Sequence, residues 1–307
     1  MKILSDFLVN LIEYSEYRGI PKYDNKIERG KYIDAKYYLD YYEEMLTLSN
    51  NQHFGLYFGF FLNLKALGSV FEISLTTSSI GQVVSLWADY SKVNFPLVKF
   101  NSYLKNDMYL IELDSDLKNM PVRNHILDTI FTFVFRELNI MIGGNVDKIY
   151  LPYKNLKPYS ELLNCDIEHG KKHTFSFDKE ILEREINAKN KKRIEILLPN
   201  FVKLLNTVEN NDFSSSVKQM ILNMCNPELP TLQQVASQFS MTERTLQRKL
   251  KKEKTSFRTI TNEIKRTLSY YLRKGKNIKT QDVAYTLGYS SSSSFLHANK
   301  QWMNFQK

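Results

Sequence analysis

Two segments near the C-terminal end of this sequence, about residues 231–250 and 279–302, each carry the pattern of two short helices joined by a tight turn. Between them, apolar residues recur at three- and four-residue steps over 257–272, which predicts one amphipathic connecting helix. Two such motifs joined by one helix predict an all-α fold for this part of the chain. They also leave the outer face of the second helix of each motif free to contact a partner.

In the first motif, capping residues predict where each of the two helices begins. Thr231 with Gln234 three residues later matches a capping box. Thr242 is expected to cap the second helix, in which Leu246 and Leu250 face inward. The residues that then face outward, and are the candidates for DNA contact, are Thr242, Glu243, Arg244, Gln247, Arg248 and Lys251.

The side-chain types on this outer face suit the reading of DNA. Arginine pairs bidentately with guanine and glutamine with adenine, so Arg244, Gln247 and Arg248 are expected to contact bases. Lys251 is expected to bind all DNA sequences alike, through phosphate. Glu243 either accepts a hydrogen bond from cytosine or balances the positive end of the helix dipole, and the second role is favoured.

The second motif follows the same plan. An apolar stripe over 283–287 is followed by Gly288, at a position where a tight turn needs a positive φ. Ser290 or Ser291 is expected to cap the next helix. The residues left as candidates for the groove or the phosphates are Ser291, Ser292, Ser294, His297 and Lys300.

The net charge of the chain lies in this C-terminal part. Residues 209–307 hold 16 lysines and arginines against 7 aspartates and glutamates, whereas residues 1–208 hold 26 of each. A basic domain beside a neutral one is typical of phosphate binding and predicts DNA affinity that weakens steeply with salt. The lysines of 249–254, taken alone, could equally be a solvated helix end, and the two flanking motifs favour DNA.

Three runs of this region, VASQFSMTERTLQRKLKKEKTSF, EIKRTLSYYL and DVAYTLGYSSSSSF, stand in an order and at a spacing that resemble the DNA-binding domain of AraC/XylS-type bacterial transcription regulators. The resemblance covers about 216–306. It implies two helix-turn-helix motifs joined by a linker helix, with recognition helices in successive major grooves about 34 Å apart.

Some residues depart from the family's pattern. Ser240 and Lys254 stand where the family usually has glycine, and a non-glycine residue in a left-handed turn costs about 1 kcal/mol. His297 and Asn299 stand where the family usually has arginine and phenylalanine. The first motif is therefore expected to carry most of the base reading.

The N-terminal region mixes helices and strands without regular alternation, which favours an α+β domain. Helices are expected over 3–17, 36–48 and 122–142, a hairpin over 96–114 with its turn at Asn106 and Asp107, and strands at KIYLPY and HTFSF. The polar stretch NTVENNDFSSS marks a boundary, so the expected parts are a domain over 1–205, a linker over 206–216 and a DNA-binding domain over 217–307.

Two runs of the N-terminal region, HFGLYFGFFLNLKALGSVFEISLTTSSIGQVVSLWADYS and YSELLNCDIEHGKKHTFSFDKEILE, resemble the regulatory domain of ornithine-utilisation-type regulators, often labelled arabinose-binding. The resemblance covers about 12–192. It implies effector sensing or dimerisation without enzymatic activity, and it maps no ligand residue onto this chain, so the effector stays open.

Three clusters of the N-terminal region have more than one interpretation. Cys165, His169 and His173 have the spacing of metal ligands on one helix face, but a loop followed by an exposed strand is favoured. The aromatic residues of 54–61 could line a ligand pocket, and core packing is favoured. The apolar stretch 130–135 is either a core helix or a dimer surface, and core is again favoured.

The sequence offers no motif for catalysis. It lacks a Walker-type phosphate loop, an H-E-x-x-H zinc pattern and a G-x-S-x-G elbow, so neither an enzyme nor a cofactor is expected. Two cysteines are too few for a disulfide framework or a four-cysteine metal site. Sensing of a metal or of redox state through Cys165 is a further alternative.

Asp6 interrupts the apolar N-terminal segment, and the longest uncharged apolar stretch, about 54–64, is too short to cross a bilayer. We therefore expect a cytoplasmic, nucleoid-associated protein without membrane contact. The expected partners are double-stranded promoter or operator DNA, RNA polymerase, a small-molecule effector and a second copy of the chain. The leading hypothesis is an effector-controlled activator, and the rival is an effector-independent DNA-bound scaffold or repressor whose N-terminal domain serves only oligomerisation or polymerase contact.

Overall fold

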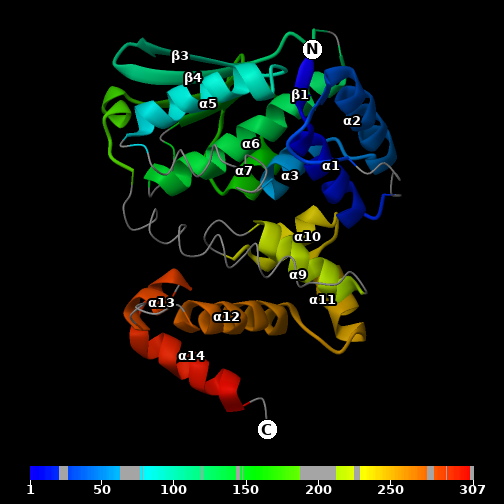
Figure 1. Cartoon of the computed structure of the whole chain (residues 1–307), viewed down its shortest axis with the longest axis vertical. Helices are drawn as coiled ribbons and strands as arrows, with labels where there is room; N and C mark the ends of the chain where they lie inside the picture. The colour runs from blue at the N-terminus through cyan, green and yellow to red at the C-terminus, as the bar shows by residue number, and fades with distance from the viewer. Residues whose placement is uncertain are drawn as a thin grey trace. The chain divides into compact units, whose positions relative to one another are not determined.

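The computed structural model describes residues 1–20, 27–62, 77, 79–118, 120–142, 146, 148–186, 212–224, 229–274, 280–287 and 289–304. The chain divides into two compact units, residues 1–188 and 189–307 (Figure 1). Of the expected linker 206–216, the first six residues lie outside the described part, and Phe213–Ser216 form the first turn of a helix.

The first unit mixes strands and helices. Its elements are β1 (Lys2–Leu4), α1 (Ser5–Tyr17), β2 (Tyr32–Asp34), α2 (Ala35–Ser49), α3 (Phe54–Phe61), α5 (Ile80–Asn94), β3 (Lys99–Lys105), β4 (Met108–Asp114), α6 (Val122–Ile142), β5 (Lys148–Leu151), α7 (Lys157–Leu163), β6 (Glu168–His169), β7 (His173–Asp178) and the 3-10 helix η2 (Lys179–Leu182). The α+β prediction for this region is therefore confirmed, and the three expected helices correspond to α1, α2 and α6.

A five-stranded sheet with the order β3-β4-β7-β5-β6 organises this unit. Neighbouring strands are antiparallel except for β5 and β6, which are parallel. The predicted hairpin is the β3–β4 pair, with positive φ at Asn106 (51°) and Asp107 (61°), as a two-residue hairpin turn that follows the sheet twist requires. β1 and β2 form a separate antiparallel pair.

β7 is buried, and the expectation that it would be an exposed strand was wrong. It lies between β4 and β5, and Phe175 stands in register with Ile111 on one side and Ile149 on the other. All three side chains are buried, and the ring of Phe131 from α6 stacks on Phe175 with 4.4 Å between centroids. These partners are distant in sequence, so the local pattern could not reveal the burial.

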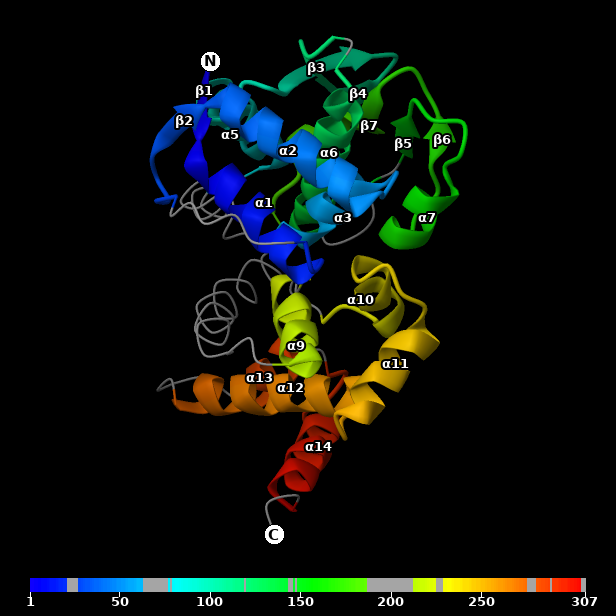
Figure 2. The same cartoon turned by 90° about the vertical axis from the view of Figure 1, so that its right-hand side faces the viewer.

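α6 is the core helix of the first unit. The stretch 130–135 is buried, and so are Phe54, Phe58, Phe60 and Phe61 of α3, so the core interpretation of both clusters is confirmed. α3 packs directly on α6, and Figure 2 shows the two helices side by side.

Glycines allow the close packing of these two helices. A Cβ at Gly55 or Gly59 would collide with the backbone carbonyl oxygen of His125 or Thr129. The same two helices are also joined by Arg136, which donates hydrogen bonds to the backbone oxygens of Phe60 and Leu62 at the end of α3.

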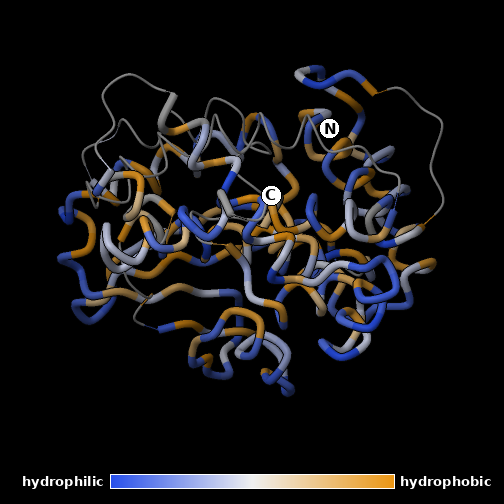
Figure 3. The backbone as a smooth tube through the Cα atoms, turned by 90° about the horizontal axis from the view of Figure 1, so that it is seen from below, coloured by the Kyte–Doolittle hydropathy of each residue, from blue (hydrophilic) through white to orange (hydrophobic). Residues whose placement is uncertain are grey.

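The second unit is helical, as expected for this region. Its described elements are α9 (Phe213–Met224), α10 (Leu232–Gln238), α11 (Glu243–Lys252), α12 (Phe257–Lys274), α13 (Thr280–Thr286) and α14 (Ser292–Asn304). α12 follows α11 along the chain and contacts α9, α13 and α14 (Figure 1). Apolar and polar residues alternate at short intervals along the backbone (Figure 3), as amphipathic helices require. Among the described residues, no helix is both long and apolar enough to span a membrane.

Candidate nucleic-acid interface

The start of α10 is fixed by the capping box that the sequence predicts. The backbone N–H of Gln234 donates to the Thr231 hydroxyl (3.2 Å), and the Gln234 side chain accepts from the Thr231 N–H (2.9 Å). The turn after α10 contains Ser240 at a φ of 50°. The left-handed turn expected at this residue is therefore present.

α11 follows this turn and has two clearly different faces. Thr242 caps the helix, because its hydroxyl accepts from the N–H of Thr245 (3.2 Å). Leu246 and Leu250 are completely buried. The residues of the opposite face, which are exposed together with the capping threonine, are Glu243, Arg244, Gln247, Arg248 and Lys251. The structure thus gathers all the candidate DNA contacts of the first motif on one solvent-facing helix surface.

The C-terminal end of α11 is tied to the first turn of α9, an interaction that the sequence patterns did not indicate. The Glu253 carboxylate accepts hydrogen bonds from the backbone N–H groups of Phe213 (3.1 Å) and Ser214 (2.8 Å). The Phe213 ring lies 5.0 Å from the Lys249 ammonium and 5.3 Å from the Phe239 ring. α9 therefore contacts the ends of both α10 and α11. The contributing residues are distant in sequence, so no local pattern could have identified them.

α13 and α14 form the second candidate pair. Val283, Ala284 and Leu287 are buried, and the aromatic core of the pair contains Phe295 and Trp302, whose ring centroids are 6.3 Å apart. Gly288, the expected turn residue, lies outside the described part of the chain.

The candidate DNA-contacting residues of α14 differ in solvent exposure and in the hydrogen bonds that they already make. His297 and Lys300 are exposed, and Ser292 is half-buried. The hydroxyl of Ser291 accepts from the N–H of Ser294 (3.1 Å), and the two hydroxyls are bonded to each other (3.2 Å). Ser291 is therefore the capping residue, and this interaction occupies part of the hydrogen-bonding capacity that both serines would offer to DNA.

The three residues with metal-ligand spacing do not form a site. His173 is buried, and its Nε2 lies 2.8 Å from Oδ1 of Asp128, a carboxylate that also accepts from the hydroxyls of Tyr153 (2.8 Å) and Tyr159 (2.7 Å). The Nδ1 of His169 instead lies 2.9 Å from the backbone oxygen of Tyr153. Within the part of the chain that the structure describes, no three histidine, cysteine or acidic side chains are placed to hold a metal ion.

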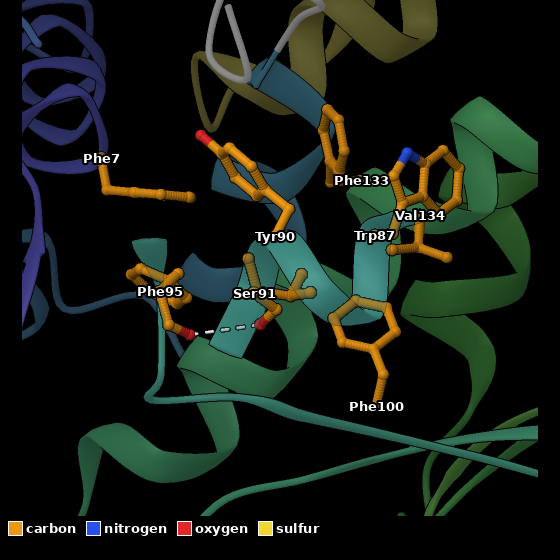
Figure 4. Close-up of a pocket in the computed structure, with 9 residues that line it drawn as sticks. Phe7, Trp87, Tyr90, Ser91, Phe95, Phe100, Phe133 and Val134 are labelled. Carbon is orange, nitrogen blue, oxygen red and sulfur yellow. Dashed lines mark hydrogen bonds between the residues drawn. The ribbon is translucent and has the colours of Figure 1, made fainter. Parts of the chain in front are cut away.

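A small apolar cavity of about 30 Å³ lies inside the first unit (Figure 4). Its lining includes Phe7 of α1, Trp87 of α5, Phe100 of β3 and Phe133 of α6. Because these residues come from four separate segments, no sequence pattern could have brought them together. The aromatic residues of 54–61, the cluster that the sequence offered as an alternative pocket, are not among its lining.

Comparisons with known proteins extend this description. A family model described as the arabinose-binding domain of AraC transcription regulators, N-terminal, matches residues 26–186, more than half of the chain. Uncharacterized HTH-type transcriptional regulators of Mycobacterium bovis and Mycobacterium tuberculosis are each 28% identical to it over 149 residues. That alignment covers 48% of this chain and 43% of each relative, so it spans less than half the length of these curated relatives.

Among solved structures, the crystal structure of the transcriptional regulator CdpR from Pseudomonas aeruginosa is similar, with 18% sequence identity and a TM-score of 0.47. The superposition covers 97% of this chain and 95% of that chain.

The matching family model describes a domain of transcription regulators, and this is the class of protein to which the chain, with its mixed α/β unit followed by a helical unit, belongs. The chain belongs to the family of AraC transcription regulators that carry the arabinose-binding type of N-terminal domain. The resemblance identified from the sequence of the N-terminal region is thereby confirmed.

Proposed function

We propose that the chain binds DNA in a sequence-specific manner through two helix-turn-helix motifs, residues 231–250 and about 279–302, joined by α12. The observation that carries the proposal is the division of α11 into a completely buried leucine face and an exposed face rich in cationic and amide side chains. Burial fixes the rotation of the helix about its axis. The exposed face is therefore presented as a unit, which is what a recognition helix in a major groove requires.

The roles proposed for this face follow from its chemistry. Arg244, Gln247 and Arg248 contact bases, because their planar groups can form paired hydrogen bonds with guanine or adenine. Lys251 and the capping Thr242 contact phosphate, which positions the helix without reading sequence. Glu243 lies in the first turn of α11, where its negative charge interacts favourably with the positive end of the helix dipole.

The second motif contributes less to base reading in this proposal. Its exposed candidates are His297 and Lys300, of which only the lysine carries a fixed positive charge at neutral pH. Ser292 and the bonded serines Ser291 and Ser294 supply phosphate contacts at the start of α14, where the helix N-terminus attracts anions.

The domain over 1–205 serves as the regulatory part, and the domain over 217–307 binds DNA. We propose that a small-molecule effector bound to the regulatory part controls activation at promoters, with the chain acting as a homodimer that contacts RNA polymerase. The competing function is an effector-independent scaffold or repressor. Heating the full chain with graded concentrations of candidate metabolites separates the two, because a ligand that binds the native state raises the melting temperature with concentration.

The test of DNA reading is capture of genomic fragments by the purified chain at near-physiological salt, followed by sequencing. We expect discrete peaks for the wild type and their loss when Arg244 and Arg248 are both replaced by alanine. Lys251→Ala is the matched control, since loss of a phosphate contact weakens all sequences alike and leaves the peaks in place. Diffuse capture that the double substitution does not change would refute sequence reading by α11.

The single variant Arg244→Ala gives the quantitative form of this expectation. It should cost about 1–3 kcal/mol on a captured site because a bidentate base contact is lost, with a smaller cost on unrelated DNA. Fluorescence-anisotropy titration of both DNAs at one salt concentration measures the ratio. Equal losses of binding free energy on the two DNAs would mean that Arg244 contacts phosphate and not a base.

A further inference from the structure

The first N–H groups of α9 have no acceptor within the helix, as at the start of any α-helix. The carboxylate of Asp212, directly before the helix, accepts from the N–H of Ser215 (2.7 Å). The N–H groups of Phe213 and Ser214 instead donate to the two oxygens of a single distant carboxylate, that of Glu253. We call this pair of bonds the tertiary cap. The start of α9 therefore depends on a residue that the local sequence does not contain.

The tertiary cap joins α9 to the first motif by strong bonds. A carboxylate that accepts from N–H groups forms charge-assisted hydrogen bonds, and its negative charge lies at the positive end of the α9 dipole. The ring of Phe213 adds a second contact, since it lies near the ring of Phe239 at the end of α10 (5.3 Å) and the ammonium of Lys249 on α11 (5.0 Å). The first turn of α9 thus contacts the ends of both helices of that motif.

Glu253 is firmly attached to α11. The helix ends at this residue, and the Glu253 N–H donates to the backbone oxygen of Leu250 (3.0 Å), whose side chain is completely buried. A shift of α9 relative to Glu253 would therefore displace the C-terminal end of α11 as well. The buried leucines fix the rotation of α11 about its axis, and the tertiary cap fixes the position of its C-terminal end.

A displaced recognition helix would lose some DNA contacts more readily than others. The paired hydrogen bonds of an arginine or glutamine with a base require both donor–acceptor distances to stay below about 3.2 Å. A lysine that contacts phosphate is a point charge on a flexible chain, so it tolerates a shift of the helix backbone. Loss of the fixed position of α11 therefore weakens base reading more than phosphate binding.

We infer that Glu253 is a positioning residue for DNA reading. Through the tertiary cap it makes α9 a supporting helix of the first motif and holds α11 where base contacts require it. The inference rests on the proposed base reading by α11. Replacing Glu253 by a neutral residue makes this surface more positive, which by charge alone favours binding to any DNA. Charge and positioning therefore predict changes of opposite sign in the affinity for a site that α11 reads.

The test compares the full chain with Glu253→Ala and Glu253→Gln. Glu253 is exposed, so neither substitution leaves a gap in the core. Fluorescence-anisotropy titration at one salt concentration measures the affinity for a captured genomic site and for an unrelated duplex. We expect Glu253→Ala to lower the ratio of the two affinities about tenfold, while the unrelated duplex binds as well as before or more tightly. Glu253→Gln, which offers one acceptor in place of two, should give an intermediate ratio.

Two controls separate positioning from charge and from stability. Glu263→Gln removes the same charge from an exposed residue of α12 whose described partner is the side chain of Lys218 (3.7 Å), and it should leave the ratio within about twofold. A residue that only stabilised the fold would lower the melting temperature and leave the ratio unchanged wherever the chain is folded. Amide hydrogen exchange of Phe213 and Ser214, followed by NMR, reports the tertiary cap without DNA and should become about tenfold faster in Glu253→Ala.

The inference is overturned if Glu253→Ala keeps the wild-type ratio, weakens both duplexes alike or leaves the amide exchange unchanged, or if Glu263→Gln lowers the ratio as much. With a wild type that prefers its captured site, each of these results rejects the positioning role and leaves the proposed function standing. A wild type that binds both duplexes equally rejects base reading by α11, and the inference with it.

Discussion

Ser240 and Lys254 hold the backbone on either side of α11 in a conformation that glycine adopts more easily. Their φ angles are 50° and 58°. A side chain in the left-handed region costs about 1–2 kcal/mol, whereas glycine adds about 0.4–1 kcal/mol of entropy to the unfolded chain. Relief of strain is the larger effect, so Lys254→Gly is expected to stabilise the second unit by up to about 1 kcal/mol.

Chemical denaturation of the full chain, followed by Trp302 emission in a Trp87→Phe background, measures this difference. Lys252→Gly is the matched control, because Lys252 is helical and loss of its helix propensity should cost about 1 kcal/mol. Equal destabilisation by both substitutions would mean that the left-handed turn carries no strain.

The reactivity of Cys165 tests the alternative that the chain senses redox state through this thiol. Burial raises the pKa of its thiol to about 12, so the thiolate that reacts with oxidants and thiol reagents is scarce at neutral pH. In a Cys225→Ser background, the native chain should react with a disulfide reagent about a thousandfold more slowly than the unfolded chain. Below the raised pKa, the rate should increase with pH. Rapid modification of Cys165 in the folded chain at neutral pH would support redox sensing through this residue.

At the scale of elements, the contact between α3 and α6 leaves no room for an added methyl group at either of two glycines, Gly55 and Gly59. Gly59→Ala places a methyl group against the backbone oxygen of Thr129, and backbone cannot move aside as a flexible side chain can. We expect a loss of about 1–3 kcal/mol or more in unfolding free energy, from overpacking. Gly19→Ala, where nothing lies near the added carbon but φ is positive (73°), isolates the conformational cost alone. Thermal unfolding followed by far-UV circular dichroism compares the two, and a smaller loss for Gly59→Ala than for Gly19→Ala would contradict close packing.

Elements with strong local signals could be predicted from the sequence, and elements defined by distant partners could not. The capping box at Thr231 and the turn at Asn106 and Asp107 depend on neighbouring residues, and the structure has both. The sequence does not reveal that the His173–Asp178 strand is buried, because this burial depends on α6 and on strands that are distant in sequence. The polar His173 in particular is accommodated by Asp128, whose position no local pattern reveals.

The same distinction applies to the candidate DNA-contacting face, to its support and to the cavity. The outward face of α11 follows from helical periodicity, so its exposure could be predicted residue by residue. The sequence does not indicate the role of Glu253, because the N–H groups that it accepts from, those of Phe213 and Ser214, are about 40 residues earlier in the chain. The cavity is not indicated for a similar reason, since α1, α5, β3 and α6 each contribute to its wall.

At the scale of the whole molecule, the net charge is distributed unequally between the two parts of the chain. The excess of positive charge lies in 209–307, while 1–208 is neutral overall. Phosphate binding releases counterions in proportion to the number of phosphates neutralised, so the logarithm of DNA affinity should fall linearly with the logarithm of salt concentration. Each phosphate contact adds about 0.9 to the steepness of that slope.

Lys251→Ala should therefore reduce the slope by about one, because one phosphate contact is removed. Lys36→Ala is the matched control, since Lys36 is an exposed lysine of the first unit that pairs with Asp40 (2.6 Å) and has no part in the proposed interface. Anisotropy titrations of one DNA duplex at several salt concentrations give the three slopes. If Lys36→Ala changed the slope as much as Lys251→Ala does, the first unit would also contact DNA, and the assignment of DNA binding to the second unit alone would be wrong.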